Sequence, residues 1–402
     1  HLIDVKYTYY GDLRNRVVGA RLMAEKIEPY FFKWNPSLPV TLYDPSDIAN
    51  IKNNLITSPP SLLLLIEPLV RLNYVDICYV WVALHYLFFL AMLVPMYLIV
   101  KNADSKYFVV AAAILLLLTD YWNDSVFRGQ SHFIFPAIIA NIFLLTSGRW
   151  KWRFLFSGLL LAFLFWVQPN ALLILPFLFF SSDVNRYQLF GGLAAGILSF
   201  VLLTLILDQG SYWADFYHTG REWVKNNSSG MKFVGTSFPG ADTERQLIPH
   251  APLPWRSQIG DIHTLAYSLF HVNIKSFYLF GLFFVTYFIC FCACLVKPAQ
   301  YFKEAILMGI LLYWFQETTA PILKMSYYFV EIFVIVLFFA GIFKELNLTC
   351  KLLLISSFLF AFSRFIPMNL LDGELCTIAC LFCFLYSAYF KGRKKLVESK
   401  NF

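Results

Sequence analysis

Charged residues are scarce in this sequence. Asp, Glu, Lys and Arg make up 14% of the 402 residues, whereas hydrophobic residues make up 59% and the mean hydropathy is +0.61. Soluble domains carry roughly 25% charged residues, so this composition argues against an ordinary soluble protein. It predicts an all-α, polytopic integral membrane protein, because helices satisfy their own backbone hydrogen bonds in lipid.

Basic residues are also not gathered into one region of the chain. The net charge is +7, but the basic residues are scattered among apolar runs. A nucleic-acid-binding protein gathers its Lys and Arg into a patch or stripe, so no nucleic-acid partner is predicted. Loops on the cytoplasmic side of a membrane account for this excess of Lys and Arg.

Cysteine motifs typical of zinc sites are absent. No CxxC pair with histidines at zinc spacing occurs, and nearly all the cysteines lie inside apolar runs, where a thiol behaves as a small buried hydrophobe. We therefore infer neither a metal site nor a disulfide. The eight residues are Cys78, Cys290, Cys292, Cys294, Cys350, Cys376, Cys380 and Cys383.

Long apolar runs are what the sequence has in abundance, and they predict about eleven membrane passes. Several are shorter than the ~20 residues of a straight span, and such segments are tolerated where protein encloses them. The runs are 75–100, 106–120, 133–147, 154–167, 169–181, 187–207, 276–296, 303–316, 326–343, 351–366 and 375–390.

Lys and Arg in the short loops predict the orientation of these passes. The tail 391–395 and the loop 148–153 are rich in basic residues, which is typical of the cytoplasmic side. The basic loops share one side only if the run 154–181 crosses twice, with a break within "WVQPNA" (Trp166 to Ala171). Five segments are then predicted on the outer, extracytoplasmic side: 1–74, 120–132, 208–275, 316–325 and 367–374.

We found no internal repeat, so residues 1–402 are predicted to form one membrane domain. It comprises a first outer loop with interfacial helices (1–74), a set of transmembrane helices (75–207), a second outer loop (208–275), and further transmembrane helices with a cytoplasmic tail (276–402). Because residue 1 is placed outside, we expect a further apolar helix upstream of it, giving about twelve passes.

The first outer loop contains the most informative polar segment. A helix is expected from about Asp12 to Glu25, and the short apolar run 58–72 reads as an interfacial or re-entrant helix. Asp12, in the first turn, can cap that helix or act as a general base toward an acceptor hydroxyl. Both roles can coexist.

Three arginines follow Asp12 on the same helix. Arg14 and Arg21 are nearly two turns apart and share a face, whereas Arg16 points elsewhere. Each guanidinium can face water or lipid headgroups, or it can bind phosphate.

Two later outer segments supply further candidates. The loop 126–133 contains Arg128, Gly129, Gln130 and His132, and the helix after it offers free N–H groups to an anion. An ordinary polar turn is the alternative. In the segment 316–329, Lys324 near membrane depth is either a functional cation or the partner of Glu317.

Two weaker constellations remain open. Asp44 and Asp47 form an acidic pair, which could suggest a metal site. Because Pro45 follows Asp44, a turn or a helix cap is favoured over a metal site. His218 and Arg221 lie among aromatic residues, a pattern that suits sugar stacking and an interfacial aromatic belt equally.

The order and spacing of three segments resemble glycosyltransferase family 87, a branch of the GT-C superfamily of polyprenyl-phosphate-dependent membrane transferases. These are "GDLRNRVVGARLM…PYFFKW" at the start, "RGQ" at 128–130, and "GLLLAFLFWVQPNALLILPFLFF" from residue 158. Together they extend the resemblance over most of the chain. The resemblance implies a GT-C-type helical fold. It also implies an active site on the extracytoplasmic face of a membrane, here expected to be a bacterial inner membrane.

The resemblance also implies roles for individual residues. Asp12 matches the catalytic aspartate of the first outer loop, and Gly129 and Gln130 match a Gly-Gln near the donor site. Gln168-Pro169 stands where the family usually has Lys-Pro, and Lys324 to Tyr327 stand where members often carry His. The expected donor-binding and acceptor-binding residues are Arg14, Arg128, Gly129, Gln130, His132, Lys324 and Tyr327.

The expected reaction moves a sugar, mannose in well-known members, from a polyprenyl-phosphate donor to a hydroxyl of a lipid or glycan acceptor. A phosphate countered by Arg or Lys is already a good leaving group, so no metal or other cofactor is required. A transporter or lipid flippase is the main alternative, since it shares broken helices and cavity charges. A non-catalytic membrane scaffold is a third reading.

Overall fold

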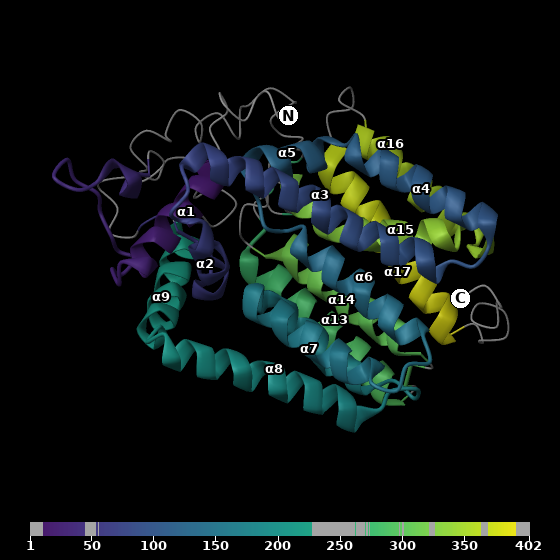
Figure 1. The fold of residues 1–402 in the computed structure, drawn as a ribbon. Coiled ribbons are helices and arrows are strands. Elements are labelled where there is room, and N and C mark those ends of the chain that lie inside the picture. Colours follow the sequence, from purple (N-terminus) through teal and green to yellow (C-terminus); the bar gives the residue numbers. More distant parts are fainter. Residues whose placement is uncertain are drawn as a thin grey trace.

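The computed structural model describes residues 11–44, 54, 56–226, 262, 270, 272, 274–296, 298–299, 301–320, 326–362 and 369–390. Helices dominate these residues (Figure 1), and no β-strand occurs among them beyond one isolated bridge between Ser181 and Ala299. The predicted all-α fold is confirmed.

Each predicted apolar run corresponds to helical structure. Among the described residues, these segments are α3 (Tyr74–Ile99), α4 (Ala103–Leu117), α6 (Ile134–Ser147), α7 (Arg153–Val167), η4 (Pro169–Phe179), α8 (Arg186–Ile206), α13 (Ser276–Val296), α14 (Phe302–Thr319), η6 (Ser326–Ile332) with α15 (Phe333–Gly341), α16 (Leu348–Phe362) and α17 (Asn369–Phe390).

Three of these helices are long and apolar enough to cross a membrane: Tyr74–Ile99, Arg186–Ile206 and Phe277–Val296. Of the others, α17 has 22 residues and α14 has 18, and the rest are shorter. The centre of the bundle is α15, in which every residue is buried, and it packs against α3, α4 and α6. The full set of about eleven passes stays a prediction.

The predicted break in the run 154–181 is confirmed. Helix α7 ends at Val167, and the 3-10 helix η4 begins at Pro169, which lacks the N–H that would continue the α-helix. Asn170 contacts Glu317 near the end of α14, whereas Phe180 pairs with Ala299 just before α14 begins. Thus η4 runs antiparallel to α14, and the chain reverses at Gln168.

Helices α7 and α8 pack through small residues. A Cβ built on Gly192 would overlap the backbone carbonyl of Leu155, and one on Gly158 would overlap that of Leu189. Close backbone approach of this kind is how helices associate in lipid, where hydrophobic exclusion from water is absent.

The adjacent glycines 191 and 192 give a matched test of this contact. Gly192→Ala is expected to lower the melting temperature in detergent, because backbone atoms of Leu155 occupy the space of the new methyl group. At Gly191 the nearest atom to a Cβ is Leu155 Cδ1 at 3.8 Å, so Gly191→Ala should be neutral or stabilise by up to about 1 kcal/mol. Equal melting of both variants would contradict the packing.

The described residues between 11 and 72 fold against one end of the bundle. Helices α1 (Gly11–Ala24), α2 (Pro60–Ile66) and α9 (Gly210–Asn226) lie together there (Figure 1). The helix predicted at Asp12–Glu25 is therefore confirmed. The run 58–72 forms α2 and the 3-10 turn η3 (Glu67–Leu69), a short helical element as predicted.

Candidate functional site

The turn after α5 (Asp120–Arg128) places Gln130 beneath α1. Thr119 caps the start of α5 by accepting a hydrogen bond from the Trp122 N–H, and Gly129 ends it in the left-handed conformation with φ 65°. The Gln130 N–H then donates to the Ser125 carbonyl at 2.9 Å. Gln130 is 1% exposed.

Asp12, Gln130 and Arg16 form one chain of hydrogen bonds. Nη2 of Arg16 donates to Oε1 of Gln130 at 2.7 Å, and Nε2 of Gln130 donates to Oδ2 of Asp12. Because the amide oxygen accepts from the guanidinium, the amide N–H₂ must face the carboxylate. Arg16 therefore sets the direction in which Gln130 holds Asp12.

Arg16 itself is fixed by two further contacts. Its Nη1 donates to the Gly129 carbonyl at 2.7 Å, and its Nε donates to Oγ of Ser58 at 3.0 Å. The residue is 8% exposed. Of the two alternatives for Arg16, the water-facing or headgroup-facing charge is wrong, because the residue is buried and its Nε, Nη1 and Nη2 each donate to a protein acceptor.

Asp12 occupies the first turn of α1 and is partly buried. A negative charge there also interacts favourably with the helix dipole. Its contact with Gln130 joins residues 118 positions apart in sequence. The carboxylate thus takes part in a tertiary contact, in addition to any role at the helix end.

A second polar group surrounds Glu331, on η6. Oε1 of Glu331 lies 2.5 Å from Nδ1 of His132 and accepts from Nε2 of Gln168 at 2.6 Å. Oε2 accepts from the hydroxyl of Tyr313 at 2.8 Å, and Gln168 Nε2 also donates to that hydroxyl at 2.7 Å. Four segments of the chain therefore meet at one buried carboxylate.

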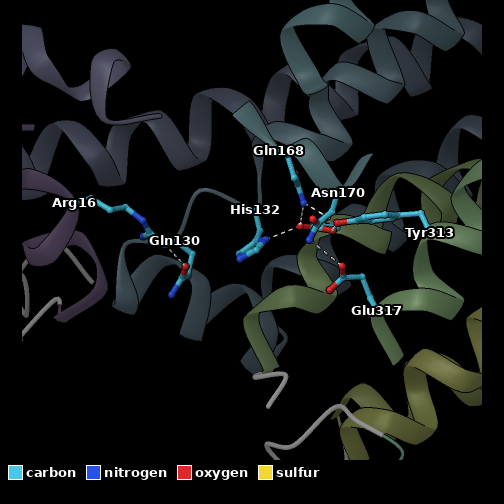
Figure 2. A network of polar contacts seen from close by, with 8 residues as sticks. Arg16, Gln130, His132, Gln168, Asn170, Tyr313 and Glu317 are labelled. Atoms are coloured by element: carbon cyan, nitrogen blue, oxygen red, sulfur yellow. Dashed lines mark hydrogen bonds and ion pairs between the residues drawn. The ribbon is translucent and has the colours of Figure 1, made fainter. Parts of the chain in front are cut away.

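The two groups are neighbours. In Figure 2, His132 lies between Arg16 and Gln130 on one side and Gln168 and Tyr313 on the other. Asp12, Arg16 and Glu331 all lie close enough to the phenol of Tyr328 to act on it electrostatically, and the Tyr328 ring packs on His132 at 4.2 Å between centroids.

The open side of this site carries amides and carboxylates. Asn170 is exposed, Gln168 and Glu317 are partly buried, and Nδ2 of Asn170 donates to Oε1 of Glu317 at 3.3 Å. We refer to Asp12, Arg16, Gln130, His132, Gln168, Asn170, Tyr313, Glu317, Tyr328 and Glu331 together as the outer cluster. Such a set of groups can bind sugar hydroxyls, orient a carboxylate and move a proton.

Sequence reasoning placed Asp12, Gln130 and His132 in the site but missed Glu331 and Tyr313. A signal for Glu331 was present, because it is the one acidic residue in the apolar run 326–343, and an ionisable residue in such a run is a functional candidate. Nothing in the sequence singles out Tyr313.

Other predicted site residues lie elsewhere. Nε of Arg14 donates to the Tyr43 carbonyl at 3.1 Å, and its guanidinium lies over the Tyr74 ring. Arg21 donates to the Thr41 carbonyl at 2.8 Å, so the predicted shared face of Arg14 and Arg21 is confirmed. Burial lowers the pKa of Arg21, and the charge of Arg14 lowers it further.

Arg128 forms an ion pair with Asp124 one turn earlier, with Nε and Oδ1 2.9 Å apart. Gly129 contributes its carbonyl to Arg16. Lys324 lies outside the described residues, and so does the side chain of Tyr327. Their substrate-binding roles stay predictions.

The weaker constellations are resolved only in part. Asp44 is buried, while Asp47 lies outside the described residues. The His218 ring packs edge-on against Phe31, and Arg221 is exposed. Among the described residues, no group of three or more His, Cys, Asp or Glu side chains is arranged to hold a metal ion.

Comparison with known proteins finds no matching family model, no matching curated protein and no matching solved structure.

Proposed function

We propose that this protein is a membrane glycosyltransferase. It moves a sugar from a polyprenyl-phosphate donor to a hydroxyl of a lipid or glycan acceptor, on the extracytoplasmic side of a multi-pass bundle. Asp12 is the general base.

The observation that carries this proposal is the way Asp12 is held. A partly buried carboxylate at the end of a helical bundle has one oxygen fixed by Gln130, whose amide is oriented by buried Arg16. A general base needs a fixed position within hydrogen-bond reach of the proton that it accepts. The arrangement supports that role better than a solvated helix cap.

The reaction balances without a further reactant. Asp12 accepts the proton of the acceptor hydroxyl as that oxygen forms a bond to the anomeric carbon. The bond between the anomeric carbon and the phosphate oxygen breaks, and the electron pair leaves with the polyprenyl phosphate. A single displacement of this kind inverts the anomeric configuration.

The leaving phosphate requires positive charge or hydrogen-bond donors. His132, beside Asp12's partner Gln130, is the candidate within the outer cluster (Figure 2). Lys324 and Arg128 are the other candidates from the sequence. The neighbouring amides of Gln168 and Asn170 suit sugar hydroxyls, which accept and donate hydrogen bonds.

The test is sugar transfer by the purified protein in liposomes. Radiolabelled polyprenyl-phosphate sugars, including the mannose form, are supplied with total membrane lipids as acceptors. We expect a labelled product that is more polar than its acceptor and has inverted anomeric configuration. Absence of transfer from every donor, combined with protein-dependent movement of labelled lipid or solute across the bilayer, would instead support a transporter or flippase.

A further inference from the structure

Glu331 is a buried carboxylate that the proposed reaction does not yet use. Its side chain is 1% exposed, and both of its oxygens accept hydrogen bonds from other segments of the chain. Burying an ionised carboxylate is costly unless it is hydrogen-bonded and paired. The three donors around Glu331, from His132, Gln168 and Tyr313, are an arrangement that meets this requirement.

His132 is the basic partner of this carboxylate. Within the described part of the chain, it is the one basic side chain at ion-pair distance from Glu331, with Nδ1 and Oε1 2.5 Å apart. Its side chain is 15% exposed, so the ring is reachable from the site. Tyr328 packs on the ring and restricts its rotation.

The contact of Nδ1 with Glu331 determines the tautomer of the His132 ring and the direction of its Nε2 atom. The two ring nitrogens are distinct, and the partner of one fixes the tautomer and the direction of the other. With Nδ1 directed at Glu331, the Nε2 edge is turned away from that carboxylate. The ring lies between the Glu331 partners and the Arg16–Gln130 pair (Figure 2).

Gln168 and Tyr313 hold Glu331 in turn. Gln168 stands at the reversal between α7 and η4, and Tyr313 lies in α14, so both come from packed parts of the bundle. Tyr313 is 1% exposed and stacks on Phe135 of α6. The carboxylate that orients His132 therefore itself accepts hydrogen bonds from two other parts of the bundle.

We propose that Glu331 is a positioning residue that acts through His132. It accepts the Nδ1–H of His132, so that the imidazolium form of the ring directs its Nε2–H at the phosphate of the donor, on the Asp12 side of the cluster. The effect of Glu331 on catalysis rests on the proposed glycosyl transfer. The protonation of Nδ1 of His132 does not depend on that proposal.

A double-mutant cycle tests the catalytic consequence. Glu331→Gln and His132→Asn are each expected to lower kcat/KM for transfer, by the roughly 10- to 100-fold typical of losing an orienting partner. The double variant should be no more impaired than His132→Asn alone, because Glu331 acts through the imidazole. Effects that multiply would overturn the proposal.

Glu317→Gln is the matched control. It removes a carboxylate from the same outer cluster, one whose Oε1 accepts a hydrogen bond from Nδ2 of Asn170. Its effect should multiply with that of His132→Asn. Equal coupling of Glu317 and Glu331 to His132 would point to general loss of negative charge and would overturn the specific claim.

A spectroscopic experiment tests the protonation of His132 even if the protein transfers no sugar. Histidine-selective ¹⁵N labelling reports which ring nitrogen carries hydrogen, and His132→Asn identifies the His132 signal among the seven histidines. We expect Nδ1 of His132 to be protonated in the wild type and this preference to be lost in Glu331→Gln. A wild-type spectrum with bare Nδ1 would refute the inference, whether or not the Glu331 variant folds.

Transfer by the wild type with a bare Nδ1 would refute this inference and leave the proposed function standing. A protonated Nδ1 in a protein that transfers no sugar would refute the proposed function and leave the Glu331–His132 arrangement standing.

Discussion

Replacement of Asp12 by asparagine is expected to reduce sugar transfer by roughly 100- to 10,000-fold, the contribution of a positioned general base. Asparagine keeps the shape of the side chain, and its Oδ1 can still accept from Nε2 of Gln130. The amide cannot take up the acceptor proton at neutral pH. The loss should therefore appear in kcat with little change in the melting temperature or in donor binding.

Asp76→Asn serves as the control for this prediction. Asp76 also lies in the first turn of a helix, α3, but it is exposed and contacts Asn73. Transfer by this variant should match the wild type. Wild-type transfer by Asp12→Asn would show that Asp12 has a structural role alone.

Replacement of Gly129 by alanine is expected to cost both stability and transfer. The residue has φ 65°, and a Cβ there would meet Cβ of Leu13 at 2.5 Å. The left-handed conformation costs a residue with a Cβ about 1–2 kcal/mol, and overpacking a core typically costs about 1–3 kcal/mol. We expect the free energy of unfolding to fall by roughly 2–5 kcal/mol.

The functional loss follows from what the clash displaces. Leu13 is adjacent to Asp12 on α1, and Gln130 follows Gly129, so relief of the clash separates the carboxylate from its amide partner. Gly148→Ala is the control, since its φ is −80° and its nearest neighbour to a Cβ is at 3.6 Å. Unchanged melting and transfer in Gly129→Ala would mean that the contact between α1 and the 129–130 turn is not required.

Local features of this fold could be predicted because they depend on neighbours in sequence. The break at Gln168-Pro169 follows from the missing N–H of proline, and the faces of Arg14, Arg16 and Arg21 follow from the helical period. The apolar runs predicted the helices because their length and composition are read directly from the chain. In each case the structure agrees.

The partners of the site residues could not be predicted in the same way. His132 and Glu331 are 199 residues apart, and Gln168 and Tyr313 are 145 apart. Their meeting depends on how α7, η4, α14 and η6 pack, which one unaligned sequence does not specify. Arg16 shows the same limit, since its face was predicted while its burial against Ser58 and Gly129 was not.

The structure also changes the expected role of one residue. The sequence resemblance suggested Gln130 as a group near the donor, whereas both ends of its amide are used on Arg16 and Asp12 and the residue is 1% exposed. Its contribution to the proposed reaction is to orient the base. Contact between Gln130 and the donor stays a prediction.

The central claim is that sugar is transferred at the outer cluster with Asp12 as the base. A structure of the protein with a non-hydrolysable polyprenyl-phosphonate sugar analogue tests it most directly. We predict the anomeric carbon beside Asp12, at a separation that admits one acceptor hydroxyl, with the phosphonate on the His132 side. An analogue bound elsewhere, with Asp12 and Gln130 untouched by any part of it, would contradict the account.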